Sequence, residues 1–445
     1  MEEEQVRSIW SESSKRPRFP TLENDIKTDV LIIGGGMAGI LCAYKLKEAG
    51  VDYALLEADR ILGGVSAGTT AKITLQHGLI YDSLIRKYDK STARLYLEAN
   101  FEALADYRRM CARIDCDYRE TDAYVYSKSG RKKLEDEVHA YGEIGYPAEL
   151  CDKVSLPIYT DGAVRVKEQA QFHPLKFGFA VSKELNIYEN SRVTELKKGG
   201  ATANGHRISA KHIIVATHFP ILNKHGLYPL KMYQHRSYVI ALENAEKVDG
   251  MYVDEAECGM SFRNYGKYLL IGGGDHRTGK PGGGWRELED FYKKRYTGAR
   301  EAARWAAQDC MTLDGMPYIG RYSKHTDGIY VATGFNKWGM SLSMAAASLL
   351  TDLITGHDGK YTEVFSPSRS ILHPKLLTNA LETTKNLLTP TVPRCPHLGC
   401  ALKYNKAEHS WDCPCHGSRF DEDGKLLDGP ATADLKRKTK EKPDA

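Results

Sequence analysis

The sequence predicts an α/β chain with a Rossmann-type nucleotide-binding domain, an inserted mixed or antiparallel β domain, and a small all-β module at its C-terminus. Three observations predict this class. An apolar run enters a glycine-rich turn at residues 29–39, alternating apolar and polar segments fill the middle, and cysteines and histidines gather at residues 395–416. With 445 residues, the chain is long enough for two or three domains.

The composition is that of an ordinary globular protein, with 42% hydrophobic and 27% charged residues. A formal net charge of +4 is mild for this length and gives no reason to expect nucleic acid as a partner. The acidic N-terminus lacks the apolar core of a signal peptide, and no apolar run reaches membrane-spanning length. We therefore expect a cytoplasmic protein without a transmembrane segment.

The first element is a continuous apolar strand at residues 29–33, of the kind that is covered on both faces in a parallel sheet. It leads into a G-x-G-x-x-G turn, a helix that ends at Gly50, and a second strand that ends at Glu57. An unrelated glycine-rich turn is the alternative, but the complete unit favours a dinucleotide. The residues expected to contact it are Gly34, Gly36, Met37, Ala38, Gly39, Glu57 and Ala58.

The middle of the chain begins with helical character from about residue 80 to residue 115. Leu97, Phe101 and Leu104 share one face of this segment because they are spaced i, i+4, i+7. Alternating segments that include residues 124–126, 237–241 and 267–271 then predict strands of a mixed or antiparallel sheet.

Two short loops near the C-terminus each offer one thiolate and one imidazole. Cys395 and His397 belong to the first loop, and Cys413 and His416 to the second. This is the ligand set of a Rieske 2Fe–2S centre, with the cysteines on one iron and the histidines on the other. Zinc is an alternative metal for these ligands, although C-x-H and C-P-C-H are not the usual zinc spacings. A site held by disulfides alone is a further alternative.

Residues from about 394 to 430 resemble Rieske proteins of the disulfide-containing type. The resemblance implies a Cys400–Cys415 disulfide, a Ser418 hydroxyl that donates to a bridging sulfide, and Phe420 where high-potential members carry a tyrosine. We therefore expect a midpoint below the top of the Rieske range. A predicted helix at residues 373–388 stands where the family has strands, so the Rieske scaffold is shortened, and the charged tail from Leu435 is expected to fray.

Residues from 32 to about 356 resemble the D-amino-acid oxidase-like family of FAD-dependent oxidoreductases. The blocks that carry this resemblance are residues 63–72, 187–193, 212–217, 314–320 and 328–340. It implies FAD as the cofactor and a substrate domain inserted between pieces of the FAD domain. The further FAD contacts that it implies are Ser66, Thr69, Thr70, Ala71, Val193, Ala216, Thr217, Asp314, Gly334, Gly339 and Met340.

These resemblances divide the chain into three parts. Residues 1–370 form the oxidoreductase domain, with FAD-binding pieces at about 28–80, 185–225 and 310–360; residues 371–391 form a helical linker; and residues 392–445 form the Rieske domain.

Three residues are candidates for contact with substrate. Arg263 could clamp a substrate carboxylate, although a structural arginine is an equal alternative. His173 and His77 could line the flavin cavity, although a lone histidine is more often structural.

Together, the motifs predict an FAD-dependent oxidoreductase that oxidises an amine or amino-acid-like small molecule. Its electrons would pass singly from FAD to the 2Fe–2S cluster and on to an external one-electron carrier. One alternative reverses this flow, so that the cluster accepts electrons and FAD reduces an acceptor. Another makes the chain a redox sensor or interaction module without turnover.

Overall fold

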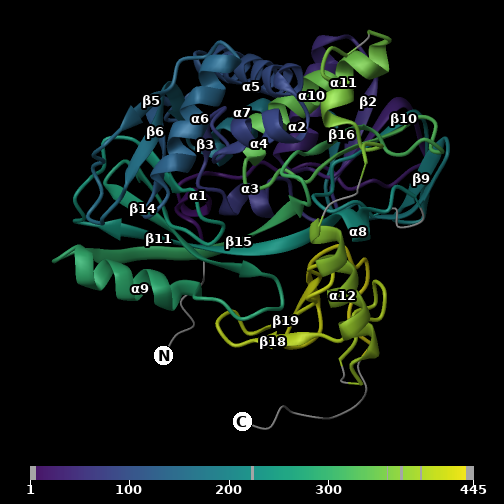
Figure 1. Ribbon diagram of the computed structural model, residues 1–445. Coiled ribbons are helices and arrows are strands. Elements are labelled where there is room, and N and C mark those ends of the chain that lie inside the picture. Colours follow the sequence, from purple (N-terminus) through teal and green to yellow (C-terminus); the bar gives the residue numbers. More distant parts are fainter. Residues whose placement is uncertain (1–6, 222–224, 358, 371–373, 391–392, 437–445) are drawn as a thin grey trace.

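The computed structural model of the chain describes residues 7–221, 225–357, 359–370, 374–390 and 393–436 (Figure 1). Strands β11 (Met232–Glu243), β14 (Tyr268–Arg277) and β15 (Arg300–Thr312) cross the middle of the view. Most helices lie above them, while helix α9 (Gly284–Arg295) and the C-terminal module lie beneath. The charged tail predicted to fray lies largely outside the described residues.

The first sheet confirms the Rossmann-type domain. Its strand order is β16-β17-β10-β1-β2-β7, and the pairs β17–β10, β10–β1, β1–β2 and β2–β7 are parallel. Helix α2 (Met37–Glu48) starts directly after the glycine turn and packs against α10 (Gly339–Thr355). The strands are β1 (Ile26–Ile33), β2 (Tyr53–Leu56), β7 (Ile187–Tyr188), β8 (Val193–Lys197), β9 (Gly200–Ala203), β10 (His206–Val215), β16 (Tyr318–Arg321) and β17 (Ile329–Thr333).

The second sheet confirms the inserted mixed domain and includes the three predicted strand segments. Its order is β15-β11-β14-β13-β12-β4-β6-β3, with β5 paired to β6. The β12–β4 pair is parallel, whereas the other pairs are antiparallel. The remaining strands are β3 (Lys72–Ile73), β4 (Arg119–Ser127), β5 (Glu149–Cys151), β6 (Gly162–Gln171), β12 (Met251–Asp254) and β13 (Ser261–Tyr265).

The helical region predicted after residue 80 forms two helices, α4 (Ile80–Lys87) and α5 (Lys90–Cys111). The buried face of α5 includes Tyr96, Asn100, Ala103 and Tyr107, which are spaced three or four residues apart. Phe101 lies beside this face and is 53% exposed. The prediction that it shares the buried face is therefore wrong, and that face is rotated by part of a turn. The other helices outside the C-terminal module are α1 (Ile9–Glu12), α3 (Val65–Gly68), α6 (Arg131–Glu143), α7 (Pro174–Ser182), α8 (Tyr228–Lys231) and α11 (Thr362–Phe365).

The C-terminal module consists of helix α12 (Pro374–Leu388) followed by a small antiparallel sheet in the order β18-β19-β20-β21. Its strands are β18 (Lys403–Asn405), β19 (Ser410–Asp412), β20 (Arg419–Asp421) and β21 (Leu426–Asp428).

The module rests on the large domain through α12. The Asn379 side chain donates to the Leu230 carbonyl at 3.2 Å and accepts from Arg277 at 2.8 Å. The Ala401 N–H donates to the Asn386 carbonyl at 3.0 Å, which joins α12 to the first cysteine loop. In the described residues, α12 stands where Rieske proteins have strands before the first ligand loop. Contact with the large domain therefore stabilises this shortened module. None of the described helices is long and apolar enough to cross a membrane.

Candidate functional site

A cavity of about 580 Å³ lies where the two large sheets and the C-terminal module meet. The end of β1, helix α2 and the start of α10 line one side. Residues of β11, β14 and β15 line another, and the segment from Leu426 to Thr432 supplies part of the wall. All three parts of the chain therefore contribute to one site.

The glycine turn brings main chain directly against this cavity. A Cβ atom at Gly34 would lie 2.5 Å from the Ala216 carbonyl oxygen, and the φ angle of +109° also requires glycine. A Cβ atom at Gly39 would lie 1.9 Å from the Gly34 carbonyl oxygen, so Gly39 allows α2 to pack on the turn instead of lining the cavity. The N-termini of α2 and α10 both open into the cavity, an arrangement that favours anionic groups.

Glu57 and Ser66 hold this edge together. The Glu57 carboxylate accepts from the Gly35 N–H at 2.7 Å and from the Asp59 N–H at 2.9 Å. Burial raises the pKa of Glu57, and these two hydrogen bonds offset part of the rise. The Ser66 hydroxyl accepts from the Met37 N–H at 3.0 Å, so the block at residues 63–72 contacts the start of α2.

Most of the predicted cofactor contacts line the cavity. They are Gly34, Gly36, Met37, Ala38, Glu57, Ala58, Ser66, Thr69, Thr70, Val193, Ala216, Thr217, Gly334, Gly339 and Met340. Three others do not line it, and the first of them, Gly39, packs α2 on the turn instead. Asp314 does not line the cavity because Arg369 holds its carboxylate at 2.6 and 2.9 Å, and Ala71 directs its carbonyl to Arg263.

Arg263 is a structural cation and not part of the cavity wall. It lies on β13, is 1% exposed, and donates from Nη1 to the Thr70 and Ala71 carbonyls at 2.6 and 2.7 Å. The Trp10 ring lies 5.5 Å from its guanidinium carbon. These contacts leave the predicted carboxylate clamp without support and assign Arg263 to fixing the residue 69–71 loop.

The two candidate histidines also lie outside the cavity wall. His173 accepts from the Lys176 N–H at 3.2 Å as the N-cap of α7, and its other nitrogen lies 2.9 Å from the Ser13 hydroxyl. His77 contacts the Tyr96 hydroxyl at 2.7 Å and stacks on Trp338 with 4.9 Å between ring centroids. Trp338 lines the cavity, so His77 contributes by supporting the wall.

Three charged residues that the sequence reasoning did not select do line the cavity. Asp275 follows the Gly272–Gly274 run on β14, Asp309 lies on β15, and Lys337 precedes α10 with a φ angle of +73°. Lys337 forms a close ion pair with Asp275. A polar residue beside a triple glycine was the available signal, whereas Asp309 sits inside an unremarkable strand.

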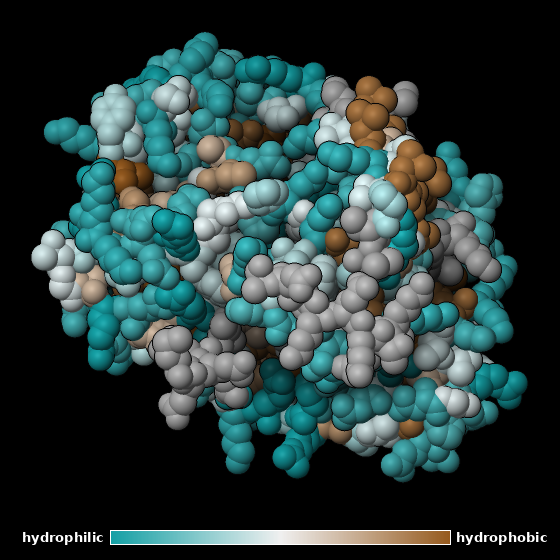
Figure 2. All heavy atoms as spheres, turned by 90° about the horizontal axis from the view of Figure 1, so that it is seen from below, coloured by the Kyte–Doolittle hydropathy of each residue, from teal (hydrophilic) through white to brown (hydrophobic). Residues whose placement is uncertain are grey.

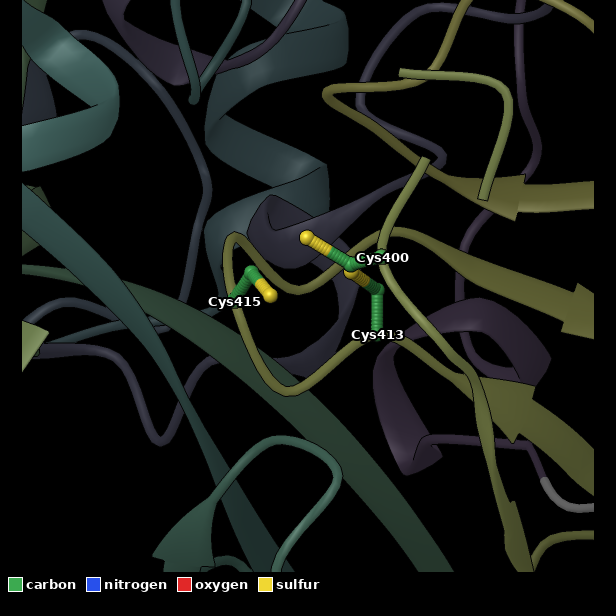
Figure 3. Close-up of side chains that lie close together, drawn as sticks. All are labelled: Cys400, Cys413 and Cys415. Carbon is green, nitrogen blue, oxygen red and sulfur yellow. The ribbon is translucent and has the colours of Figure 1, made fainter. Parts of the chain in front are cut away.

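The cysteine loops meet beside the cavity. The sulfurs of Cys400, Cys413 and Cys415 lie within 4.8 Å of one another, and Figure 3 shows Cys415 directed toward the other two. Cys395 and Cys413 are both buried. Cys400 and Cys415 are drawn as separate thiols whose sulfurs lie within this distance, so the Cys400–Cys415 disulfide stays a prediction.

The two histidines predicted as ligands face each other, with 5.0 Å between ring centroids and 88° between planes. Burial lowers the pKa of His397 to about 4 and of His416 to about 3, so both rings are neutral at neutral pH, as metal ligands must be. His416 is 1% exposed, and its Nδ1 has no hydrogen-bond partner among the described residues. A buried imidazole nitrogen without a partner fits a group that coordinates metal.

The second ligand loop is pressed against the large domain. The Gln308 side chain donates to the Gly417 carbonyl at 2.8 Å, and Arg277 donates to the Pro414 carbonyl at 3.3 Å. A Cβ atom at Gly417 would lie 2.2 Å from the Gln234 side chain. Hence the loop fits closely onto β11, β14 and β15.

A buried ion network joins the same surfaces. Arg236 of β11 donates from Nε to Glu408 at 3.0 Å, and Arg419 of β20 donates to the other Glu408 oxygen at 2.8 Å. Arg419 also contacts Asp412 at 3.0 Å. Burial alone would raise the pKa of Glu408, but Arg236 and Arg419 lower it on balance.

Comparison with known proteins assigns both parts of the chain. Residues 29–353 match the DAO family of FAD-dependent oxidoreductases, and residues 381–439 match the Rieske [2Fe-2S] domain. The Bacillus subtilis protein YhfW, whose name describes a Rieske 2Fe-2S iron-sulfur protein, is 34% identical over 97% of each chain. Gamma-glutamylputrescine oxidoreductase of Escherichia coli is 27% identical over 77% of this chain and 87% of that protein.

Among solved structures, glycine oxidase from Geobacillus kaustophilus superposes with a TM-score of 0.64 and 18% identity. The match covers 77% of this chain and 99% of that one. The fold of the large domain is therefore that of this enzyme.

Proposed function

Because the chain belongs to the DAO family of FAD-dependent oxidoreductases and ends in a Rieske [2Fe-2S] domain, we propose that it is an amine or amino-acid-like substrate dehydrogenase that sends electrons through its Rieske cluster. FAD and the 2Fe–2S cluster are its cofactors. A flavin can accept an electron pair from an organic substrate and release the two electrons one at a time to a one-electron acceptor, which is the chemistry that this pairing needs.

The residues of the glycine turn and of α10 would hold FAD along the cavity. Main-chain N–H groups at the start of α2 would face the pyrophosphate, and Glu57 would accept from a ribose hydroxyl. The start of α10, at Gly339 and Met340, would lie against the flavin ring, where the helix N-terminus stabilises negative charge. Cys395, His397, Cys413 and His416 would hold the cluster.

The observation that carries the proposal is the placement of the second ligand loop beside the cavity. Phe219 lines the cavity, and its ring centroid lies 6.4 Å from that of His397 and 6.3 Å from that of His416. The Cys413 N–H donates to the Ser418 carbonyl at 2.8 Å, and the Ser418 hydroxyl accepts from the Ala431 N–H at 3.0 Å. Since Ala431 also lines the cavity, two short routes connect cluster ligands to the flavin site.

Exposed apolar residues on the other side of the proposed cluster site favour docking of an external one-electron carrier there. Pro396 and Leu398 of the first loop are exposed, and α12 beside it exposes Leu377, Leu381 and Leu388. In Figure 2, hydrophobic atoms gather on the right of the face seen from below, the side on which α12 lies. An apolar surface next to a redox centre is suited to brief docking of a carrier protein.

Anaerobic rapid mixing of the purified holoenzyme with a panel of amines and amino acids tests this function. We expect the flavin absorbance to bleach first and the signal of the reduced cluster in electron paramagnetic resonance to follow. If a reduced ferredoxin reduces the cluster while no amine bleaches the flavin, electrons flow in the reverse direction. If neither centre responds to any donor, the proposal fails.

A further inference from the structure

The substrate end of the cavity carries more negative than positive side chains. We propose that it recognises a cationic amine that lacks an α-carboxylate, with an ammonium group held between Asp275 and Asp309. This inference rests on the proposed function and specifies its substrate class. Three observations carry this inference. They are the charge balance of the lining residues, the unpartnered oxygen of Asp275, and the absence of a free cation among the described lining residues.

Asp275 offers a buried oxygen to the cavity. Its side chain is 8% exposed, and Lys337 binds one of its carboxylate oxygens in a close ion pair. The other oxygen, Oδ1, is buried and has no hydrogen-bond partner among the described residues. An unpaired carboxylate oxygen in such a place is costly unless a donor arrives, and a ligand ammonium is a suitable donor.

Three other carboxylates of the lining each have a donor or a cation beside them. Lys133 lies 3.0 Å from Glu255, and the Tyr233 hydroxyl donates to Glu257 at 3.0 Å. Asp254 also has a buried oxygen without a hydrogen-bond partner among the described residues, but Lys128 lies 2.9 Å from that oxygen and balances its charge.

Asp275, Asp309 and Lys337 form the inner group. With both carboxyls ionised, this group has one negative charge in excess. Burial raises the pKa of Asp309 to about 6, and Asp275 adds to the rise while Lys337 opposes it. One ligand ammonium would balance the group and keep both carboxylates ionised.

An α-amino acid would need the opposite, a free cation for its carboxylate. Among the described residues, the lysines and arginines that line the cavity are Arg60, Lys72, Arg192 and Lys337. Arg60 is bound by Glu189 at 2.8 Å, Arg192 precedes the predicted FAD contact Val193, and Asp275 holds Lys337.

Lys72 is poorly placed for this role as well. It belongs to β3, at the other edge of the sheet from β15, and burial lowers its pKa to about 7. Arg263, the clamp expected from the sequence, is bonded to main-chain carbonyls. The cavity is therefore better matched to a cation than to a carboxylate.

Calorimetric titration of the anaerobic, chemically prereduced holoenzyme tests this inference without turnover. The probes are 1,4-diaminobutane, the uncharged butane-1,4-diol, glycine and L-proline. We expect the diamine to bind at least about tenfold more tightly than the diol or either amino acid, the difference that one charge-assisted contact provides. Tighter binding of glycine or L-proline, or equal binding of the diol, would overturn the inference.

Variants locate the contact. Asp309→Asn should weaken diamine binding by about tenfold or more, whereas Asp290→Asn, the same change at an exposed position of α9, should not alter it. Lys337→Met should leave diamine binding at least as tight, because it removes the competing cation. Loss of amino-acid binding in Lys337→Met, with no effect of Asp309→Asn, would instead assign Lys337 to a substrate carboxylate.

The two proposals fail separately. Diamine binding in the prereduced enzyme does not depend on electron transfer to the cluster. If the diamine binds as expected but a bleached flavin never reduces the cluster, only the proposed electron route is refuted.

Discussion

The two ligand loops of the Rieske domain are alike in sequence but differ in surroundings. Residues 395–400 expose Pro396 and Leu398, the latter by 45% of its surface. Residues 413–418 are buried throughout, against the wall of the FAD cavity. Each loop supplies one cysteine and one histidine, so the difference lies in what covers them. The site proposed for the cluster therefore has one side toward the cavity and one side toward solvent.

The largest expected effect comes from removing the cluster, because the two loops then no longer share a redox centre. Cys413→Ser takes away a thiolate ligand of the buried loop, so we predict complete loss of iron and acid-labile sulfide with FAD retained. Metal analysis and the flavin spectrum check this. The exposed Cys258→Ser is the control and should keep both cofactors. Retention of iron in Cys413→Ser would contradict the ligand assignment.

Breaking the ion network should separate the buried loop from the large domain. Glu408→Gln leaves Arg236 and Arg419 without their shared carboxylate, and loss of one partner of a buried pair costs about 3–5 kcal/mol. We predict earlier unfolding of the C-terminal module in chemical denaturation. Glu422→Gln, at an exposed carboxylate of the same module, should change it little.

The same network predicts an acid-sensitive interface. Because the pKa of Glu408 is lowered in the folded protein, its ionisation stabilises the fold fully above the ordinary glutamate value of 4.5. That contribution is lost as pH falls from about 4.5 through the lowered value. Hydrogen exchange of residues 401–421, corrected for its intrinsic pH dependence, should show increasing opening between pH 5 and pH 3, which Glu408→Gln should reduce. An unchanged pH profile in this variant would rule out Glu408 as the cause.

A matched pair of glycines sharpens the contrast between the loops. Gly399 and Gly417 have φ angles of +79° and +83°, so alanine imposes similar backbone strain on each. Only at Gly417 would the added Cβ meet the large domain, at Gln234, and such overpacking costs about 1–3 kcal/mol. Stopped-flow measurements should show cluster reduction slowed about tenfold in Gly417→Ala with unchanged flavin bleaching, since about 1.4 kcal/mol is tenfold in a docking equilibrium.

Gly399→Ala has no neighbour within 4 Å of the added Cβ and serves as the control. Equal slowing in the two variants would show that backbone strain, and not contact with the large domain, controls electron transfer.

The smallest expected effect concerns the cluster's potential. Phe420 of β20 is fully buried and has no donor to a ligand thiolate, so we predict a midpoint below about +300 mV. Phe420→Tyr should raise this midpoint modestly in a redox titration, and Tyr404→Phe, at a partly exposed position on β18, should leave it unchanged. A wild-type midpoint near the upper limit, with no rise in Phe420→Tyr, would refute this reasoning.

The residues proposed to hold the cofactors could be selected from the sequence because their chemistry is encoded in short contiguous stretches. The glycine turn requires close backbone approach at Gly34 and Gly39, and the two cysteine loops present their ligands within a few residues. The proposed substrate end could not be predicted, because Asp275, Asp309 and Lys337 come from three separate segments. His77, His173 and Arg263 looked available in sequence, but partners distant along the chain occupy them.

The docking of the buried loop also escaped the sequence, since it depends on Gln234, Arg277 and Gln308, whose types are common on any surface. The resemblance to Rieske proteins showed that a stretch of scaffold was missing. It did not show that the large domain and α12 take its place.

We propose that electrons pass between FAD in the cavity and the cluster beside it. The most direct test is a combined visible and electron paramagnetic resonance time course after a bleaching amine is mixed with anaerobically purified protein. We predict that flavin reduction is followed by appearance of the reduced 2Fe–2S signal. Bleached flavin with an iron-loaded cluster that stays oxidised, or protein that contains flavin but no iron or acid-labile sulfide, would contradict the claim.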